Sequence, residues 1–533
     1  MERVIVTNNL SDYSIAVRRN TGPAEKFAAL ELRKYLQMVS GVALPILQER
    51  AGEKAFILGE AAGDSSGSCK TRLTEDGFTI KTYGRRIYLK GGSSRAVLYA
   101  VYYFLEKYLG CGWCVPGDDT VPRKSELVLG DIDDTQEPVF KFRAVLNFPL
   151  DSERTRKEID WFAKNRINWA HPCPNGLELW RKCSARETIM PEYVKRGLHI
   201  MWGGHTFLAF LPPEKYFDTH PEYYGFIGRE RKRPDPYAGS LCVSNPEVPK
   251  IMAENIVEFA GKNPEIEIFD LWMNDTTDWC ECEKCNIFEG STAYTRHDHM
   301  FNPDGKHPSR SAAYCRFVNE VGEHVKKCNP NIVISPLSYS CCVEPPGDVA
   351  IGNNVLVGFA LISRIWNRSL VKSGIPINDA YREVVKAWRK KTDRLYVYEY
   401  YGHFLANPLS DIPISAGQMA EELRYYLSLD IDKICTEAVK WSDAVMYAYA
   451  RLTWNPDLRT EEIIKDFSRR YYGKAWSVMT DFWLAQEKKG VWEKRKKAGL
   501  ARLSQAKRLA EDEKILNRIT RLEKMFALKE KDG

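Results

Sequence analysis

The sequence predicts an α/β protein built on a central (β/α)8 TIM barrel, with a small N-terminal α/β domain and a helical C-terminal region. Three observations carry this prediction. Residues 136–453 contain eight short apolar runs typical of buried strands, and helical periodicity lies between several of them. Residues 1–135 alternate strand and helix patterns before that rhythm begins. Residues 454–533 have a helical pattern almost to the end of the chain.

Length and composition fit a globular chain of several domains. The 533 residues exceed one ordinary domain, and 44% hydrophobic with 28% charged residues allow a sizeable core. The net charge is only +6, and the basic residues of 487–497 are interleaved with acids, so we expect no nucleic-acid partner. We expect no membrane partner either, because the apolar segment 96–109 is short and contains Glu106 and Lys107. The composition does not fix the oligomeric state.

The cytoplasm is the predicted location. The first residues show no basic segment followed by a long apolar run, so no secretion signal is expected. The 14 cysteines are scattered through a long chain, which fits a reducing compartment better than a disulfide framework.

The elements of the N-terminal domain follow from local patterns. Apolar spacing predicts helices at 23–36, ended by Ser40-Gly41, and at 94–109, ended by Gly110. The turn at 83–85 predicts a hairpin. The predicted strands are 4–6, 14–17, 78–81 and 86–89.

The eight barrel strands are predicted from apolar runs that are rich in β-branched and aromatic residues. They are 143–148, 167–170, 198–202, 266–272, 332–337, 355–359, 395–399 and 433–437. Helical patterns lie between several of them, at 158–165, 312–327, 381–391 and 418–427. In the C-terminal region, glycines predict helix breaks at Gly473, Gly490 and Gly499.

Three carboxylates stand at predicted strand ends: Asp275 after the fourth strand, Glu399 on the seventh and Glu437 on the eighth. Such ends meet at one face of a barrel, so we expect the three side chains to converge there. Glycoside hydrolysis uses a proton donor together with a second carboxylate. One such carboxylate could equally cap a helix or pair with an arginine. Three of them, flanked by Trp and Tyr, predict a glycoside hydrolase that acts on an oligosaccharide.

The expected roles differ between the three. Asp275 is the predicted proton donor, because Trp272 and Trp279 would bury it and raise its pKa. Glu399 is the predicted opposing carboxylate, either as the nucleophile or by orienting a substrate acetamido group. Glu437 either exchanges roles with Glu399 or holds sugar hydroxyls. These carboxylates suffice for the chemistry, so we expect catalysis to require no metal cofactor.

Polar and aromatic residues near the same strand ends are predicted to bind the sugar. His205 follows two glycines at a strand end, which favours substrate binding over the alternative of a satisfied core histidine. The predicted substrate-binding residues are Asn147, Trp202, His205, Asn274, Trp279, Tyr339, Tyr401, His403 and Trp441.

Closely spaced cysteines follow the fourth strand. Cys280, Cys282 and Cys285 are near enough in sequence to share one tetrahedral zinc ion, with His297 or His299 as the expected fourth ligand. Such a zinc would be structural. The alternative is that the three thiols simply pack a tight loop.

Several stretches carry a resemblance to a known family. They are 29–36 with Ser40-Gly41, 99–113, Asn274-Asp275 with 279–285, 316–321, and 452–456 with 471–475. On them the chain resembles a bacterial family of glycosidase-like (β/α)8 barrels formerly of unknown function. The N-terminal domain of that family is similar to that of α-glucuronidases and family 20 hexosaminidases.

The resemblance implies a glycosidase but no definite substrate. Some relatives are endo-β-N-acetylglucosaminidases, which supports a glycosidase; glycans that contain N-acetylhexosamine or uronic acid are the candidate substrates. At 398–400 this sequence has Tyr-Glu-Tyr where Trp-Asp-Tyr is expected, so the relatives' substrate does not carry over. Asn274-Asp275 and Glu399 also resemble the Asn-Glu and Glu placement of the large retaining-glycosidase clan. The alternative function is a non-catalytic carbohydrate-binding or scaffold protein on the same barrel.

Overall fold

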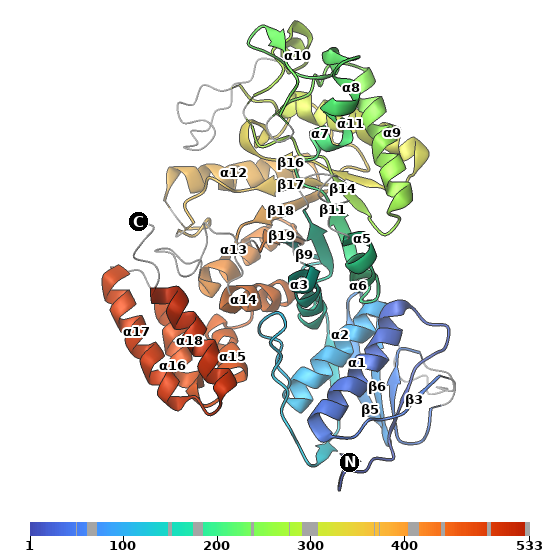
Figure 1. The fold of residues 1–533 in the computed structure, drawn as a ribbon, viewed down its shortest axis with the longest axis vertical. Helices are drawn as coiled ribbons and strands as arrows, with labels where there is room; N and C mark the ends of the chain where they lie inside the picture. The colour runs from blue at the N-terminus through green and yellow to red at the C-terminus, as the bar shows by residue number, and fades with distance from the viewer. Residues whose placement is uncertain are drawn as a thin grey trace.

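A computed structural model shows an N-terminal α/β domain, a central barrel and a C-terminal group of helices (Figure 1). No helix in the part of the chain given below is both long and apolar enough to cross a membrane. The structure describes residues 1–48, 51–60, 72–147, 152–173, 185–235, 239–276, 278–289, 308–366, 368–372, 374–402, 415–438, 443–487 and 492–527.

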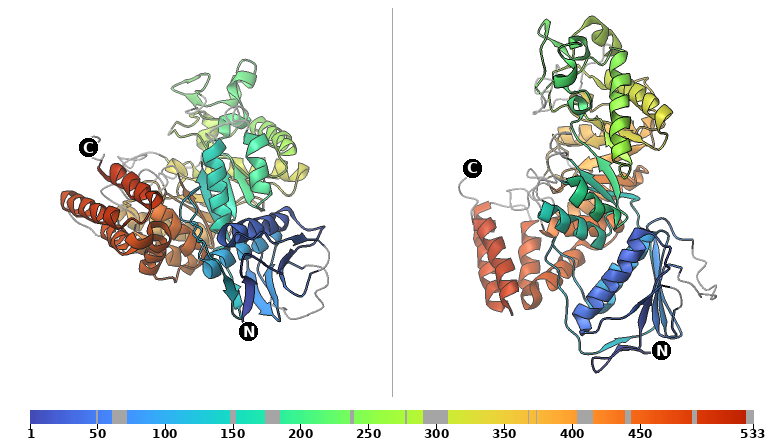
Figure 2. Two further views of the ribbon diagram at one scale, coloured as in Figure 1. Left: turned by 60° about the horizontal axis from the view of Figure 1, so that its bottom comes forward. Right: turned by 45° about the vertical axis from the view of Figure 1, so that its right-hand side comes forward.

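The N-terminal domain is a six-stranded sheet with two helices side by side against it (Figure 2). The predicted hairpin and both predicted helices are confirmed; the second helix ends in a π-helical turn before Gly110. The sheet order is β3 (Ile46–Leu47), β2 (Ser14–Ala16), β4 (Ala55–Leu58), β6 (Arg86–Gly91), β5 (Phe78–Tyr83), β8 (Asp133–Gln136). The helices are α1 (Pro23–Ser40) and α2 (Ser94–Phe104), and β1 (Arg3–Val6) pairs separately with β7 (Leu127–Leu129).

The barrel confirms all eight predicted strands. Nine strands form one parallel sheet, and the last pairs with the first, so that the sheet curls into a barrel. Two of the nine belong to the fifth predicted strand. In chain order they are β9 (Phe142–Asn147), β10 (Trp169–Pro172), β11 (His199–Trp202), β14 (Ile268–Asp270), β15 (Val333–Ser335), β16 (Leu337–Ser338), β17 (Val357–Ala360), β18 (Leu395–Glu399) and β19 (Lys433–Glu437).

The fifth strand is divided at Pro336, which has no N–H to donate to a neighbouring strand. Below it β15 pairs with β14, and above it β16 pairs with β17. A tyrosine bridges the gap that opens between β14 and β16. The hydroxyl of Tyr314 donates to the carbonyl of Leu271 at 2.6 Å and accepts from the N–H of Leu337 at 3.2 Å.

Helices surround the barrel, and the three connections after β10, β11 and β14 carry short elements. The flanking helices are α3 (Ser152–Lys164), α9 (Glu247–Lys262), α11 (Ser311–Cys328), α12 (Pro376–Lys391), α13 (Ala416–Ser428) and α14 (Asp443–Trp454). Between β10 and β11 lie α5 (Ala185–Thr188) and α6 (Met190–Val194). After β11 come α7 (Phe207–Phe210), α8 (Pro213–Tyr216), η2 (Pro221–Tyr223) and the hairpin of β12 (Phe226–Ile227) and β13 (Glu230–Arg231); α10 (Glu283–Glu289) follows β14.

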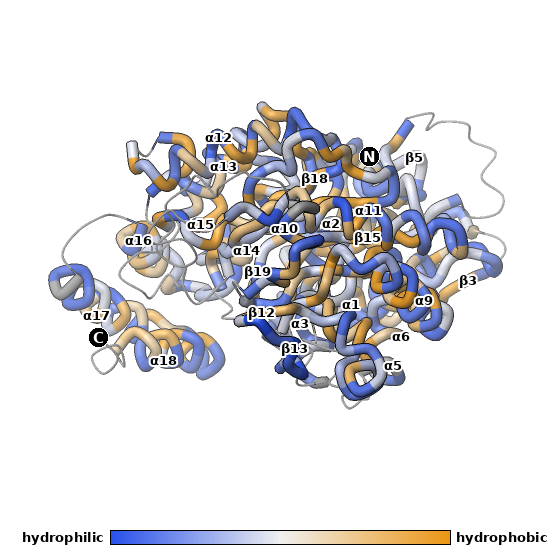
Figure 3. Tube along the Cα trace, turned by 90° about the horizontal axis from the view of Figure 1, so that it is seen from above, coloured by the Kyte–Doolittle hydropathy of each residue, from blue (hydrophilic) through white to orange (hydrophobic). Residues whose placement is uncertain are grey.

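The C-terminal region consists of α15 (Thr460–Tyr472), α16 (Trp476–Gln486), α17 (Trp492–Leu509) and α18 (Glu513–Ala527). Hydrophobic and hydrophilic segments alternate along α17 and α18 (Figure 3). Gly473 ends α15 with a positive φ of 49°, as predicted. The predicted break at Gly499 is wrong, because this glycine lies inside α17. A Cβ there would come 2.6 Å from the ring of Phe526, so glycine lets α18 pack closely.

A buried carboxylate joins the N-terminal domain to the barrel. Asp76, just before β5, accepts hydrogen bonds from Arg95 at 2.8 Å and from Arg143 and Asn168 at 2.7 Å each. Arg95 lies on α2, whereas Arg143 lies on the first barrel strand and is fully buried. Burial opposes the charge of Asp76, but the two guanidinium groups hold its pKa below the ordinary value.

We expect Asp76→Ala to destabilise the fold by about 3–5 kcal/mol, because it leaves two buried guanidinium groups without their carboxylate. Urea unfolding monitored by tryptophan fluorescence measures this as a lower midpoint. Asp12→Ala is the matched control, since it removes an exposed ion pair with Lys54 and should not move the midpoint measurably. Equal midpoints for Asp76→Ala and the control would show that this network does not hold the domains together.

Candidate active site

Two carboxylates meet at the C-terminal ends of the barrel strands. Asp275 follows β14, and Glu437 is the last residue of β19. Each is held by a tyrosine: Tyr339 donates to Oδ1 of Asp275 at 2.8 Å, and Tyr398 donates to Oε1 of Glu437 at 2.7 Å. The charge of Asp275 acts on Glu437 and on both Tyr339 and Tyr400, so the two carboxylates share one site.

Aromatic rings line this pair, and we call them the aromatic wall: His205, Trp272, Tyr339, Tyr398 and Tyr400. The ring of Trp272 lies 5.3 Å from Tyr398 and 5.8 Å from His205, centroid to centroid, both edge-on. Tyr398 lies 5.2 Å from Tyr400, and His205 lies 6.2 Å from Tyr339. Aromatic faces of this kind pack well against the apolar faces of sugar rings.

The two carboxylates have different surroundings. Burial raises the pKa of Glu437 to about 7, the charge of Asp275 raises it as well, and the hydrogen bond from Tyr398 opposes the shift. Asp275 is exposed. The expected burial of Asp275 by two tryptophans is wrong, because the Trp279 ring is itself buried, edge-on to Tyr314 of α11.

Glu399 does not lie with Asp275 and Glu437. It alternates with Tyr398 along β18, and successive residues of a strand point to opposite faces. Its carboxylate is fully buried between β18 and α13, where it accepts from Tyr426 at 2.5 Å and lies 3.3 Å from Arg364. Arg364 also donates two hydrogen bonds to the carboxylate of Glu422, at 2.8 and 3.0 Å. Burial raises the pKa of Glu399 to about 7 although Arg364 opposes the shift.

Three predicted substrate-binding residues are likewise buried in packing away from the pair. The hydroxyl of Tyr401 donates to Glu422 at 3.0 Å. Trp202 packs among phenylalanines between β11 and α9, and Asn147 donates to Glu158 of α3 at 3.3 Å. His403 and Trp441 lie outside the described residues.

His205 and Asn274 lie next to the pair. Nδ1 of His205 is 2.5 Å from the carbonyl oxygen of Met273, which can only accept, so this nitrogen carries the hydrogen and Nε2 can accept. Gly203 precedes His205 with a φ of 135°, and a Cβ there would come 2.8 Å from the Cβ of Asp270. Glycine is therefore needed for the backbone to pass β14 and present His205. Asn274 is buried.

A buried polar pair that the sequence analysis did not single out joins two barrel strands, β10 and β14, that lie on either side of β11. Nε2 of His171 on β10 is 2.5 Å from Oδ2 of Asp270 on β14, and both side chains are fully buried. Burial is the main cause that raises the pKa of Asp270. The edge of Trp272 lies over His171, with ring centroids 5.4 Å apart, so this pair supports the aromatic wall from within the barrel.

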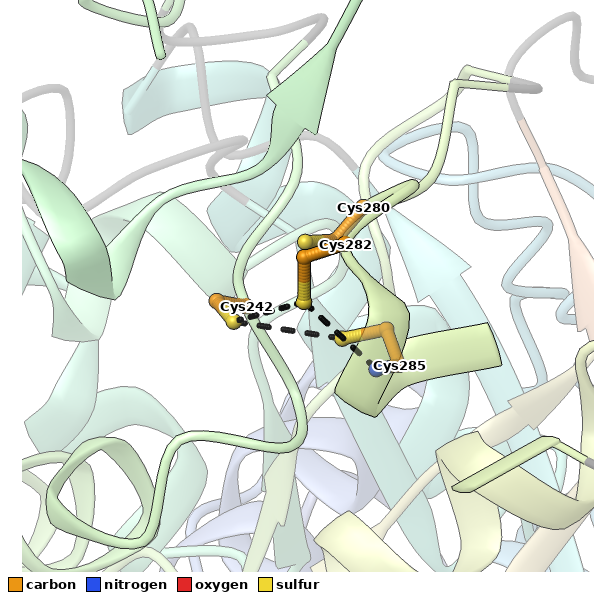
Figure 4. Close-up of side chains that lie close together, drawn as sticks. All are labelled: Cys242, Cys280, Cys282 and Cys285. Atoms are coloured by element: carbon orange, nitrogen blue, oxygen red, sulfur yellow. Dashed lines mark hydrogen bonds between the residues drawn. The ribbon is translucent and has the colours of Figure 1, made fainter. Parts of the chain in front are cut away.

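Four cysteines gather beside the loop that carries Asp275 (Figure 4). Cys280, Cys282 and Cys285 are joined by Cys242, which lies between β13 and α9 and which the spacing did not reveal. All four sulfur atoms lie within 4.8 Å of one another. His297 and His299, the predicted source of a fourth ligand, lie outside the described residues.

Sequence comparison gives two family matches. The family described as "Domain of unknown function (DUF4838)" matches residues 113–483. The family described as "Glycosyl hydrolase family 67 N-terminus" matches residues 7–104. No curated protein matches the chain significantly.

Solved structures of glycoside hydrolases share the fold. The GH115 4-O-methyl-α-glucuronidase BtGH115A has a TM-score of 0.58 at 12% identity, covering 93% of this chain and 62% of that one. A GH138 enzyme targeting pectin rhamnogalacturonan II has 0.57 at 12%, covering 92% and 56%. The N-acetyl-β-hexosaminidase of Streptomyces plicatus has 0.54 at 14%, covering 88% and 90%. The chain thus spans less than two thirds of the first two enzymes, and at these identities the likeness shows the fold.

The matches agree with the architecture. The family 67 match falls on the N-terminal α/β domain, and the longer match spans the barrel and the first C-terminal helices. These findings confirm the predicted resemblance to a glycosidase-like barrel family with an α-glucuronidase-type N-terminal domain. Because the longer match covers well over half of the 533 residues, the chain belongs to the family described as a domain of unknown function, DUF4838.

Proposed function

We propose that this protein is a glycoside hydrolase that cleaves a glycosidic bond in an oligosaccharide. The observation that carries the proposal is the placement of Asp275 and Glu437 at the strand ends, each held by a tyrosine of the aromatic wall, with the pKa of Glu437 raised to about 7. A carboxyl group that keeps its proton near neutral pH, beside a second carboxylate, is what hydrolysis of a glycoside requires.

The surroundings favour Glu437 as the proton donor. Its carboxyl group passes the proton to the leaving oxygen as the bond to the anomeric carbon breaks, and Asp275 faces the positive charge that develops there. A water molecule then adds to the anomeric carbon and releases a proton, so that Glu437 is protonated again. The sequence favours Asp275 as the donor and Glu399 as the opposing carboxylate. We assign the donor role to Glu437 instead, because it is more buried than Asp275, and the opposing role to Asp275. Glu399 takes no part in this scheme, since Arg364 and Tyr426 hold it on the other side of β18. The step uses no metal.

The substrate class follows from the chain's similarities. The family 67 N-terminal match and the likeness to a glucuronidase and a hexosaminidase favour a glycan that contains uronic acid or N-acetylhexosamine. We propose that the protein meets this glycan in the cytoplasm, on the evidence of its scattered cysteines.

The direct test is a panel of aryl glycosides and oligosaccharides carrying uronic acid or N-acetylhexosamine. We expect new reducing ends from at least one member, and none from the double variant Asp275→Asn, Glu437→Gln. Isothermal titration calorimetry with the same panel tests the alternative function, that of a non-catalytic carbohydrate-binding protein. Sugar binding without release of reducing ends from any member would favour a non-catalytic carbohydrate-binding protein.

Leaving-group dependence distinguishes the two roles. We expect Glu437→Gln to lower kcat/KM by about 10²-fold or more on oligosaccharides, the scale of general acid catalysis, and far less on aryl glycosides that need little protonation. Asp275→Asn should lower both to a similar extent. Glu399→Gln is the matched carboxylate control, and it should lower the unfolding midpoint rather than kcat/KM. If instead Asp275→Asn affects oligosaccharides far more than aryl glycosides, and Glu437→Gln affects both alike, Asp275 is the proton donor, as predicted from the sequence.

The pH dependence gives an independent check. If Glu437 is the donor, kcat/KM should fall as the pH rises through about 7, because the carboxyl group loses its proton. Tyr398→Phe removes a hydrogen bond that favours the charged form, so the falling limb should move to higher pH. Tyr401→Phe is the control and should leave the limb in place, since the Tyr401 hydroxyl donates to Glu422 rather than to Glu437. A limb that Tyr398→Phe leaves in place would exclude Glu437 as its origin.

A further inference from the structure

Four thiols from two separate segments converge on one point. Cys242 lies in the segment between β13 and α9, 38 residues before Cys280 (280 − 242 = 38). Cys280 and Cys282 precede α10, and Cys285 lies within its first turn. Three of the four side chains are buried, and Cys282 is partly exposed. Figure 4 shows Cys242 facing the other segment, with its sulfur toward Cys282 and Cys285.

The spacing of the sulfur atoms fits a metal rather than disulfides. Zinc binds thiolates at about 2.3 Å in a tetrahedron, which sets neighbouring sulfurs about 3.8 Å apart. Sγ of Cys242 lies 3.8 Å from that of Cys282 and 3.9 Å from that of Cys285. A disulfide would need about 2.0 Å, and all four cysteines are free.

The surroundings of the sulfur atoms suit thiolates. The backbone N–H of Phe226 donates to Cys280 at 3.3 Å, and the N–H of Cys285 donates to Cys282 at 3.5 Å. The guanidinium of Arg231 lies 3.9 Å from the sulfur of Cys242 and supplies a positive charge. Four thiolates around one divalent ion carry a net charge of −2, which N–H donors and an arginine offset. Donors that contact the ligands in this way hold them in place around a metal.

We propose that Cys242, Cys280, Cys282 and Cys285 bind one structural zinc ion. Four protein ligands leave no position for water or substrate, which is the pattern of structural rather than catalytic zinc sites. Thiolates are soft ligands, so magnesium, calcium and manganese are excluded as the resident ion. The fourth ligand is therefore Cys242, and neither His297 nor His299 is needed.

The ion would tie two loops of the barrel face together. One loop carries the β12–β13 hairpin, and the other runs from Asp275 to α10. Apart from the ion they are joined by the N–H of Glu281, which donates to the carbonyl of Phe226 at 2.7 Å, and by the N–H of Gly228, which donates to the carboxylate of Glu281 at 3.0 Å. The ion would thereby fix the start of α10 and the segment that leads back to Asp275. This second role rests on the proposed function, whereas zinc binding does not.

The test is the metal content of the full-length protein produced in zinc-supplemented medium and measured by plasma mass spectrometry. We expect one zinc per chain in the wild type and in Cys328→Ser, whose thiol is exposed and lies outside the cluster. Cys242→Ser should lose most of the zinc and unfold at a lower temperature. A wild type with substoichiometric metal or with iron, or a Cys242→Ser variant with full zinc, would overturn the proposal.

Two further measurements need no variant. Cobalt added to the chelated wild type should give the visible bands of a tetrahedral thiolate complex, and octahedral spectra would count against the site. Alkylation followed by peptide mass spectrometry should show these four cysteines protected with zinc and modified after chelation; equal modification in both states would contradict the proposal. These readouts stand whether or not the protein hydrolyses glycosides. Loss of turnover on chelation, with recovery on adding zinc, tests the effect on Asp275 separately.

Discussion

The arrangement of the two domains depends most on the hydrogen bonds and ion pairs that the buried carboxylate of Asp76 makes. This carboxylate satisfies one arginine from the N-terminal domain and one from the first barrel strand. A buried charge is stable only when it is paired and hydrogen-bonded, so the buried Arg143 of the barrel depends on a carboxylate that the N-terminal domain supplies. Asn168 adds the second barrel strand to the same carboxylate. The contact between the domains therefore involves the barrel strands themselves, and the candidate site lies at the ends of the barrel strands.

The sequence predicts the barrel well because each strand is a short apolar run bounded by polar turns, and all eight runs are strands in the structure. It predicts the direction of strand-end side chains poorly. Parallel barrel strands are buried on both faces, so Leu395–Glu399 shows no apolar–polar alternation to tell which residues face the centre. Tyr398 faces Trp272 and Glu437, which leaves Glu399 facing α13. Cys242 was missed for another reason: only the fold brings it to the other three cysteines.

The candidate site is asymmetric in a way that composition could not show. Glu437 ends a strand and is surrounded by the aromatic wall, whereas Asp275 lies in a loop and is exposed. The position of Glu437, buried at the end of its strand, is what raises its pKa. The tyrosines that hold them come from strands five and seven, so the geometry of the pair depends on four strands.

Tyr314 inserts a side chain into the hydrogen bonding between two segments of the barrel wall. Between Leu271 and Leu337 a phenol hydroxyl stands where two backbones would normally bond directly. The width of a backbone ladder is set by peptide geometry and is nearly the same in every protein. Where a side chain bridges two strands instead, the size of that side chain influences the distance between them. Asp275 and Tyr339 follow this contact closely in their two segments, so the side chain at position 314 of α11 contributes to the spacing of the candidate site. A substitution of Tyr314 would therefore change the spacing of the candidate site without altering Asp275, Tyr339 or Glu437.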